Sequence, residues 1–226
     1  CKLILQQFEK IKRPLEAESK DETLFYAGTC YYDVGELEIA GERLAEIDIA
    51  SRYAVPAFEY YMGALRQTGH QSAGLEYLKK AQNLDHFQNK ERILLYKTEF
   101  HLDLEQWVEA LSTMKELVGV SPNKKEDPWF LLNVARTLDQ IVLAMGNKQW
   151  LTQRPNLKSA KYYKRQAIIY YREANKYMPP DQKAVRLSIL EILIKHHEDQ
   201  KAWKTLTYQY RTAIKLSDDN HQKDQY

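Results

Sequence analysis

Two successive stretches of 34 residues decide the fold of this chain: DETLFYAGTCYYDVGELEIAGERLAEIDIASRYA (residues 21–54) and VPAFEYYMGALRQTGHQSAGLEYLKKAQNLDHFQ (residues 55–88). When the second stretch is laid over the first, Gly69 falls on Gly35 and Leu78 falls on Leu44. Each stretch therefore reads as a helix, a turn at the glycine and a second helix. A repeat of this length indicates a stack of helix pairs, because one pair cannot bury its apolar face alone.

The same organisation is expected along the rest of the chain. The predicted helices are 21–34 with 37–51, 55–68 with 71–84, 90–103 with 105–119, 128–145 with 159–177, and 182–197 with 200–216. The spacing drifts by two residues in the third pair, so the repeats are degenerate. We divide the chain into a leader with one extra helix (1–20), a repeat domain (21–217) with an insertion at 147–158, and a polar tail (218–226).

The repeat resembles the tetratricopeptide repeat (TPR), which alternates large and small residues at fixed positions. The first repeat offers Leu24, Gly28, Tyr31, Gly35, Ala40, Leu44 and Ile47, and the second offers Phe58, Leu65, Gly69, Gly74, Leu78 and Ala81. Small residues let two helices approach, and large ones fill the groove to the next pair. The resemblance implies an all-α fold, a right-handed α–α superhelix of about five helix pairs.

In the TPR family the first helix of each pair lines a concave groove that holds a protein or peptide segment. Carried over position by position, the resemblance implies a partner-binding groove made of Phe25, Tyr26, Thr29, Tyr32, Tyr60, Arg66, Tyr96, Glu99, Arg136 and Gln140. Aromatic and charged side chains of this kind bind peptides by stacking and hydrogen bonds. Some of these tyrosines are expected to pack between repeats instead.

Charge is unevenly spread along the chain. Residues 1–120 carry 14 Lys and Arg against 20 Asp and Glu, whereas residues 121–226 carry 19 against 11. The basic part includes Lys161, Lys164, Arg165 and Arg172, interleaved with paired tyrosines. Such a pattern is found in polyanion-binding helices, nucleic acid included, but it also describes an ordinary solvated helix face, which the sequence favours.

The chain begins at Cys1, and its only other cysteine is Cys30 in an apolar helical stretch. Two cysteines do not make a disulfide framework, and Cys30 is expected to be a small core residue. Mature bacterial lipoproteins begin at a lipidated cysteine, so one alternative is an envelope lipoprotein that is anchored through Cys1 and aids assembly or secretion of a larger complex. The sequence leaves the compartment open between the cytoplasm and the bacterial periplasm, and it shows no apolar run long enough to span a bilayer.

No catalytic motif, metal-ligand spacing or phosphate-binding glycine loop is present, so the sequence predicts no enzyme, cofactor or metal. The run His196-His197-Glu198-Asp199 is expected to be a helix-end cluster, because adjacent helical residues point about 100° apart. The leading interpretation is a scaffold or adaptor that binds a protein or peptide segment. A second alternative is the regulatory segment of a longer enzyme. The sequence does not determine the oligomeric state.

Overall fold

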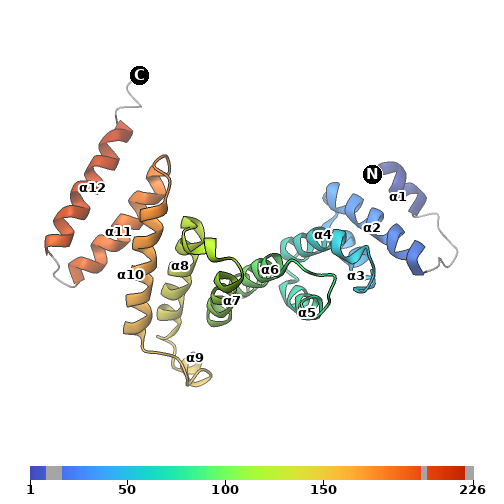
Figure 1. The fold of residues 1–226 in the computed structure, drawn as a ribbon, viewed down its shortest axis with the longest axis horizontal. Coiled ribbons are helices and arrows are strands. Elements are labelled where there is room, and N and C mark those ends of the chain that lie inside the picture. The colour runs from blue at the N-terminus through green and yellow to red at the C-terminus, as the bar shows by residue number, and fades with distance from the viewer. Residues whose placement is uncertain (9–16, 200–202, 222–226) are drawn as a thin grey trace. The chain divides into compact units, whose positions relative to one another are not determined.

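The computed structural model describes residues 1–8, 17–199 and 203–221. The regular secondary structure of these residues is helical, with no strand among them (Figure 1). The α-helices are α1 (Lys2–Phe8), α2 (Ala17–Asp33), α3 (Leu37–Ala45), α4 (Ala54–Gln67), α5 (Gln71–Ala81), α6 (Lys90–Asp103), α7 (Trp107–Val120), α8 (Pro128–Ala144), α9 (Lys148–Thr152), α10 (Ala160–Tyr177), α11 (Lys183–Asp199) and α12 (Trp203–His221), with a 3-10 turn η1 at Pro122–Lys125. Within the described residues, each expected helix has a counterpart, and α3 and α5 end earlier than expected. Residues 9–16 of the leader and residues 200–202 of the expected helix 200–216 lie outside the described residues.

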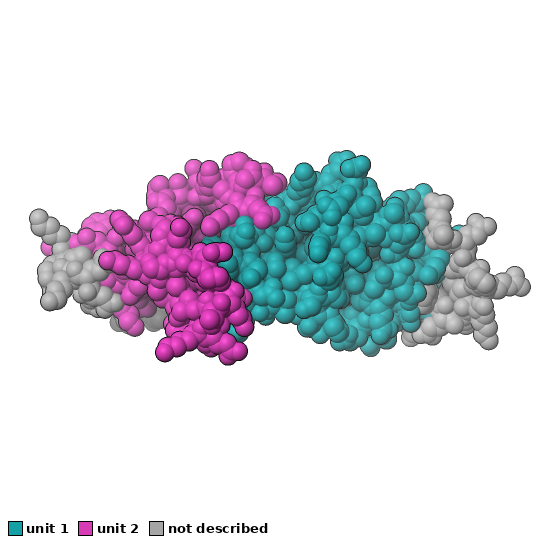
Figure 2. Space-filling view, turned by 90° about the horizontal axis from the view of Figure 1, so that it is seen from below, with its two compact units in different colours: residues 1–113 teal, residues 114–226 magenta. Residues whose placement is uncertain are grey.

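The chain divides into two compact units, residues 1–113 and 114–226, which are coloured separately in Figure 2. The sequence offers no linker between them, and the division falls within α7. Unit 1 contains α1 to α6, and unit 2 contains α8 to α12. Each unit is described by itself below.

Three helix-to-helix turns of unit 1 share one hydrogen-bond pattern. The amides of Glu36, His70 and Gln106 donate to carbonyls five residues earlier, on Tyr31, Leu65 and His101. In each turn the preceding residue donates to a carbonyl three residues back, which completes a Schellman motif. The accepting carbonyls are 34 and then 36 residues apart, which confirms the two-residue drift of the third repeat.

The residue at the centre of each turn has a left-handed conformation. Gly35 and Gly69 have φ values of 86° and 80°, a region in which glycine has no steric cost. The third turn uses Glu105 at φ 56°, without a glycine. The turn geometry is therefore repeated even where the glycine signal is lost.

Small residues allow the helices of unit 1 to pack closely. A Cβ atom on Gly28 would lie 2.6 Å from the Leu44 side chain, so α2 approaches α3 at that point. A Cβ atom on Gly74 would lie 2.1 Å from the ring of Phe100, which is completely buried. One apolar cluster built from α2 to α6 includes Leu44, Phe58, Leu78 and Phe100. The alternation of small and large residues in the sequence thus corresponds to the interdigitation of the helices.

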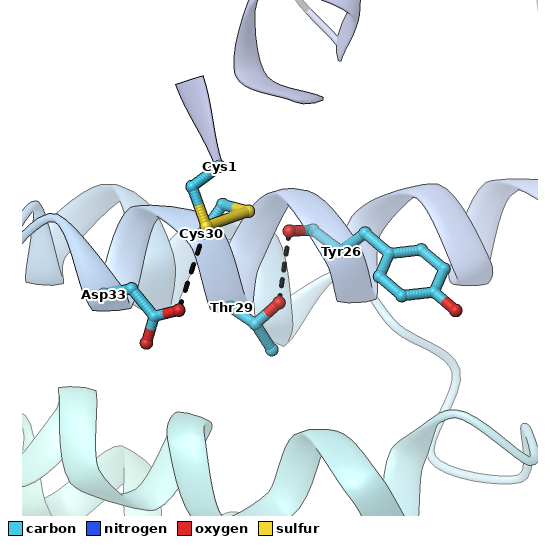
Figure 3. The surroundings of a disulfide bond; sticks show 5 residues. All are labelled: Cys1, Tyr26, Thr29, Cys30 and Asp33. Atoms are coloured by element: carbon cyan, nitrogen blue, oxygen red, sulfur yellow. Dashed lines mark hydrogen bonds between the residues drawn. A yellow bond between two sulfur atoms is a disulfide. The ribbon is translucent and has the colours of Figure 1, made fainter. Parts of the chain in front are cut away.

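A disulfide bond joins Cys1 to Cys30, which lies near the C-terminal end of α2 (Figure 3). The two Cα atoms lie 4.9 Å apart, within the usual range for a disulfide. Cys30 is buried, as expected for a small core residue, and the sequence did not predict that it forms a disulfide bond with Cys1. A sulfur in a disulfide cannot also carry a thioether lipid, so lipidation of Cys1 and this bond exclude each other in one molecule. Lipidation stays an untested prediction.

In unit 2, α8 and α10 lie side by side, and α11 packs against both α10 and α12. The buried face of α10 carries Tyr163, Ala167, Tyr171 and Ala174, which recur at helical spacing. The Tyr171 hydroxyl donates to Asp139 Oδ2 on α8 at 2.7 Å. Burial raises the pKa of the Asp139 carboxyl, whereas the Tyr171 hydrogen bond and the Lys164 charge act in the opposite direction.

The insertion at 147–158 contains the short helix α9. Asn147 caps it by accepting hydrogen bonds from the amides of Gln149 and Trp150. The Arg154 guanidinium lies over the Trp150 ring, 4.6 Å from its centroid. The insertion is therefore a locally ordered loop whose own residues hold it together.

Candidate interaction surfaces

The first helices of unit 1 contact one another through aromatic and polar side chains. Tyr32 on α2 meets Tyr60 on α4 edge to face, with ring centroids 5.5 Å apart. The Tyr32 hydroxyl accepts a hydrogen bond of 3.0 Å from the Gln67 amide. A Cβ atom on Gly63 would lie 2.7 Å from that hydroxyl, so the glycine makes room for it. Tyr32 and Tyr60, both predicted groove residues, therefore also link α2 to α4.

Arg66 links α4 to α6 by pairing with two carboxylates. Its Nη1 donates to Glu99 at 2.6 Å, and its Nε donates to Asp103 at 2.8 Å. Burial raises the pKa of Glu99; Arg66 opposes that rise and the Asp103 carboxylate adds to it. Because the pair is about two-fifths exposed, solvent weakens the attraction.

A second ion pair joins the same two helices nearer to their N-terminal ends. The Arg92 guanidinium donates to both oxygens of Glu59, and the Tyr96 hydroxyl donates to Glu59 Oε2 at 2.6 Å. Burial acts to raise the pKa of Glu59, but the hydrogen bonds from Arg92 and Tyr96 outweigh it, so the pKa lies below its usual value. Glu59 and Arg92 were not singled out by the sequence, since no local pattern joins residues 33 positions apart.

The other predicted groove residues of unit 1 lie on α2. Phe25 is half-buried against the apolar cluster, and its ring lies 6.0 Å from the ring of Tyr53. Tyr26 is 47% exposed, and the Thr29 hydroxyl donates to the Tyr26 carbonyl within the helix (Figure 3). Tyr26 is therefore the aromatic side chain that α2 presents most openly among the predicted groove residues.

Arg136 and Gln140 are exposed on α8 of unit 2. The structure thus brings the eight groove residues of unit 1 onto the first helices α2, α4 and α6, and it places the last two on a separate unit. Binding of a partner by any of the ten remains a prediction.

A cavity of about 300 Å³ lies between the start of α4 and the start of α6. Its apolar lining includes Val55, Phe58 and Phe87, and the Glu59–Arg92 pair lies at its side. Sequence reasoning missed this cavity, because Phe87 comes from the loop that follows α5 and carries no helical period.

The four basic residues predicted as a polyanion patch all line one cavity of about 500 Å³ in unit 2. Lys161, Lys164, Arg165 and Arg172 lie on α10, where spacings of three, four and seven residues place them on one side of the helix. Ile168, Ile169 and His196 also line this cavity. The four basic residues therefore lie together, as their spacing predicted. The binding of a polyanion by this patch remains a prediction.

His197 on α11 holds Arg172 at this cavity. The His197 ring is buried, and its Nδ1 lies 2.7 Å from the Leu193 carbonyl, to which only an N–H can bond. The lone pair is therefore on Nε2, which accepts from Arg172 Nη2 at 2.6 Å. The ring of the adjacent His196 meets the His197 ring edge to face, with centroids 5.6 Å apart.

The described part of the chain contains neither a cluster of three or more potential metal ligands nor a helix long and apolar enough to cross a membrane. The acidic end of the His196–Asp199 run lies where side chains are not described.

The fold is similar to that of several solved structures. A structure described as "MamA RS-1 ArsTM double mutant" superposes with a TM-score of 0.60 at 14% identity, covering 89% of this chain and 96% of that one. "MamA MSR-1 C2" superposes at 0.55 with 12% identity, covering 88% and 98%. A putative kinesin light chain of Podospora anserina, described as having nearly identical TPR-like repeats, superposes at 0.53 with 12% identity, covering 92% and 100%.

No known family profile matches the sequence, and no curated protein matches it in sequence. At such low identities the structural likeness concerns the fold. Together with the repeated turns of unit 1, it shows that this chain has an all-α, TPR-like fold of degenerate helix-pair repeats.

Proposed function

We propose that the chain is a non-enzymatic scaffold that binds a protein or peptide segment on the face formed by α2, α4 and α6. The TPR-like fold supports this, because stacked helix pairs offer extended surfaces for partners. The observation that carries the proposal is the set of links between these three helices, formed by Tyr32 with Tyr60, Arg66 with Glu99, and Arg92 with Glu59.

These links matter because a binding face is more effective when it is already ordered. A partner that meets fixed side chains loses less free energy to ordering than one that meets mobile chains. Tyr26 and Arg66 remain exposed enough to contact a partner while their helices stay in place. Tyrosine and arginine are also the residue types that contribute most often to binding hot spots.

Site-specific photo-crosslinking tests the proposal. Benzoylphenylalanine replaces Tyr26 on α2 in one variant and the exposed residue Glu76 on α5 in a matched control. After irradiation in an extract of the native cells, we expect one protein adduct from position 26 that is absent from position 76. Equal adducts from both positions, or none from position 26, would contradict the proposed face.

A further inference from the structure

We propose that the basic cavity on α10 binds a segment of a partner protein in which carboxylates flank an apolar side chain. This site lies in unit 2 and does not depend on the face of α2, α4 and α6. Its cavity of about 500 Å³ is large enough to take several side chains of a peptide.

The first argument is charge. Lys161, Arg165 and Arg172 are exposed, and they share one side of α10 with Lys164. Asp139 on α8 acts on Lys164 and offsets part of its charge. Three cations therefore remain to attract carboxylates, and arginine offers the planar fork that suits a carboxylate best.

The second argument is the apolar part of the lining. Ile168 and Ile169 lie between the cations along the helix, and Ile169 is 43% exposed. Ile168 is only 7% exposed, so it is mainly Ile169 that an apolar side chain of a ligand would cover and remove from water. A sugar–phosphate backbone has no comparable group, and the described lining offers no Tyr, Trp or Phe ring on which a base could stack. The cavity therefore favours an acidic and apolar peptide over nucleic acid.

The third argument is the fixed position of Arg172. The buried His197 ring accepts from Nη2, so one edge of the guanidinium is occupied and its remaining donors keep a constant direction. Lys161 and Arg172 are 11 residues apart on α10, which corresponds to about 16 Å at 1.5 Å per residue. A ligand that reaches both cations spans about five extended residues or three helical turns.

Fluorescence anisotropy with the full chain at low salt tests the proposal. The probe is a fluorescein-labelled peptide that repeats Glu-Glu-Leu, and two further probes repeat Gln-Gln-Leu and Glu-Glu-Ser. A labelled 20-nucleotide single-stranded DNA is the fourth probe. We expect the Glu-Glu-Leu peptide to bind at least tenfold more tightly than the Gln peptide and at least fivefold more tightly than the Ser peptide.

Matched variants place the binding at this cavity. Lys161→Glu with Arg165→Glu reverses two charges in the lining, whereas Lys79→Glu with Lys80→Glu makes the same change at exposed positions of α5. We expect at least a tenfold loss of affinity in the first variant and less than a threefold loss in the second. Ile169→Glu, at an exposed position, should also weaken binding about tenfold without a change in the melting temperature.

Four results would overturn the proposal. The first is that the Glu-Glu-Leu peptide does not bind, and the second is that both double variants lose the same affinity for it. The third is that the Glu-Glu-Leu and Glu-Glu-Ser peptides bind equally tightly. The fourth is that the DNA binds more tightly than the Glu-Glu-Leu peptide and that Lys161→Glu with Arg165→Glu abolishes this DNA binding. The last two would identify a general polyanion site and a nucleic-acid site, respectively.

Discussion

Gly74 is the position at which a single methyl group has the largest consequence for packing. A Cβ atom there would lie 2.1 Å from the buried Phe100 ring. We expect Gly74→Ala to lower the free energy of unfolding by about 1–3 kcal/mol, because the α5–α6 contact has no room for the added atom. Urea denaturation measures the change.

Gly119 supplies the control for this prediction. It is also helical, but no atom beyond the neighbouring backbone of its own helix lies within 4 Å of the Cβ that alanine would add. Gly119→Ala should therefore raise the free energy of unfolding by about 0.5–1 kcal/mol through helix propensity alone. A gain in stability for Gly74→Ala, like the gain expected for Gly119→Ala, would contradict the close packing of Phe100 on Gly74.

Arg66 makes stability depend on pH. Glu99 has a raised pKa, and loss of the Arg66 charge in Arg66→Gln should raise it further. A carboxyl whose pKa is raised on folding destabilises the fold when it is ionised. The variant is therefore less stable than the wild type above the pKa of Glu99, and this difference in the free energy of unfolding shrinks as the pH falls through that pKa. We expect a loss of about 0.5–1 kcal/mol at pH 7 and a smaller loss near pH 4.5.

Urea denaturation at the two pH values checks this, with Lys79→Gln on α5 as the exposed control. A deficit that grows on acidification would show that Arg66 does not neutralise Glu99 and Asp103.

At the scale of elements, Asp139 and Tyr171 join α8 to α10. Tyr171→Phe removes the hydroxyl that donates to Asp139 and leaves a half-buried carboxylate without this partner. We expect a loss of about 1–3 kcal/mol in the free energy of unfolding. In an Asp139→Asn background the same substitution should cost less, because no ionised carboxylate remains. Additive effects in a double-mutant cycle would exclude the proposed coupling.

The disulfide joins Cys1, the residue just before α1, to α2 and closes a long loop. The two cysteines are 29 residues apart, and a loop of that size corresponds to about 3–4 kcal/mol of stabilisation by the chain-entropy argument. Cys1→Ser, at an exposed position, should lower the melting temperature, and dithiothreitol should lower that of the wild type to the same value. If dithiothreitol leaves the wild-type melting curve unchanged, the bond does not contribute to stability.

Several elements could be predicted from sequence because their signals are local. Gly35 and Gly69 marked their turns, and helical spacing placed Lys161 and Arg165 on one side of α10. The third turn gave no such signal, since Glu105 adopts the left-handed conformation there.

Other features depend on which helices meet. The Cys1–Cys30 bond requires α1 to lie against α2, and the support of Arg172 by His197 requires α11 to lie against α10. The sequence placed His197 only in a helix-end cluster. Likewise, it presented Arg66 as a groove residue, whereas the structure shows that Arg66 also links two helices. Pairings between distant residues follow from packing, which no single-sequence pattern contains.

At the scale of the whole molecule, each of the two units carries its own kind of surface. Unit 1 carries a face of linked first helices, and unit 2 carries a basic and partly apolar cavity. Salt separates their contributions, because screening shortens the reach of exposed charges to about 3 Å at 1 M ionic strength but leaves apolar contacts in place.

Affinity capture from an extract of the native cells tests most directly whether this chain is a protein-binding scaffold. The capture is made once in low salt and once in about 0.5 M salt, where attractions between exposed charges are largely screened. The captured proteins are identified by mass spectrometry, with Tyr26→Ser and Lys161→Glu/Arg165→Glu as parallel baits. We predict one protein that the wild type retains through high salt and that at least one of the variants loses. Retention of polyanions alone, all released by salt, or of nothing at all would contradict it.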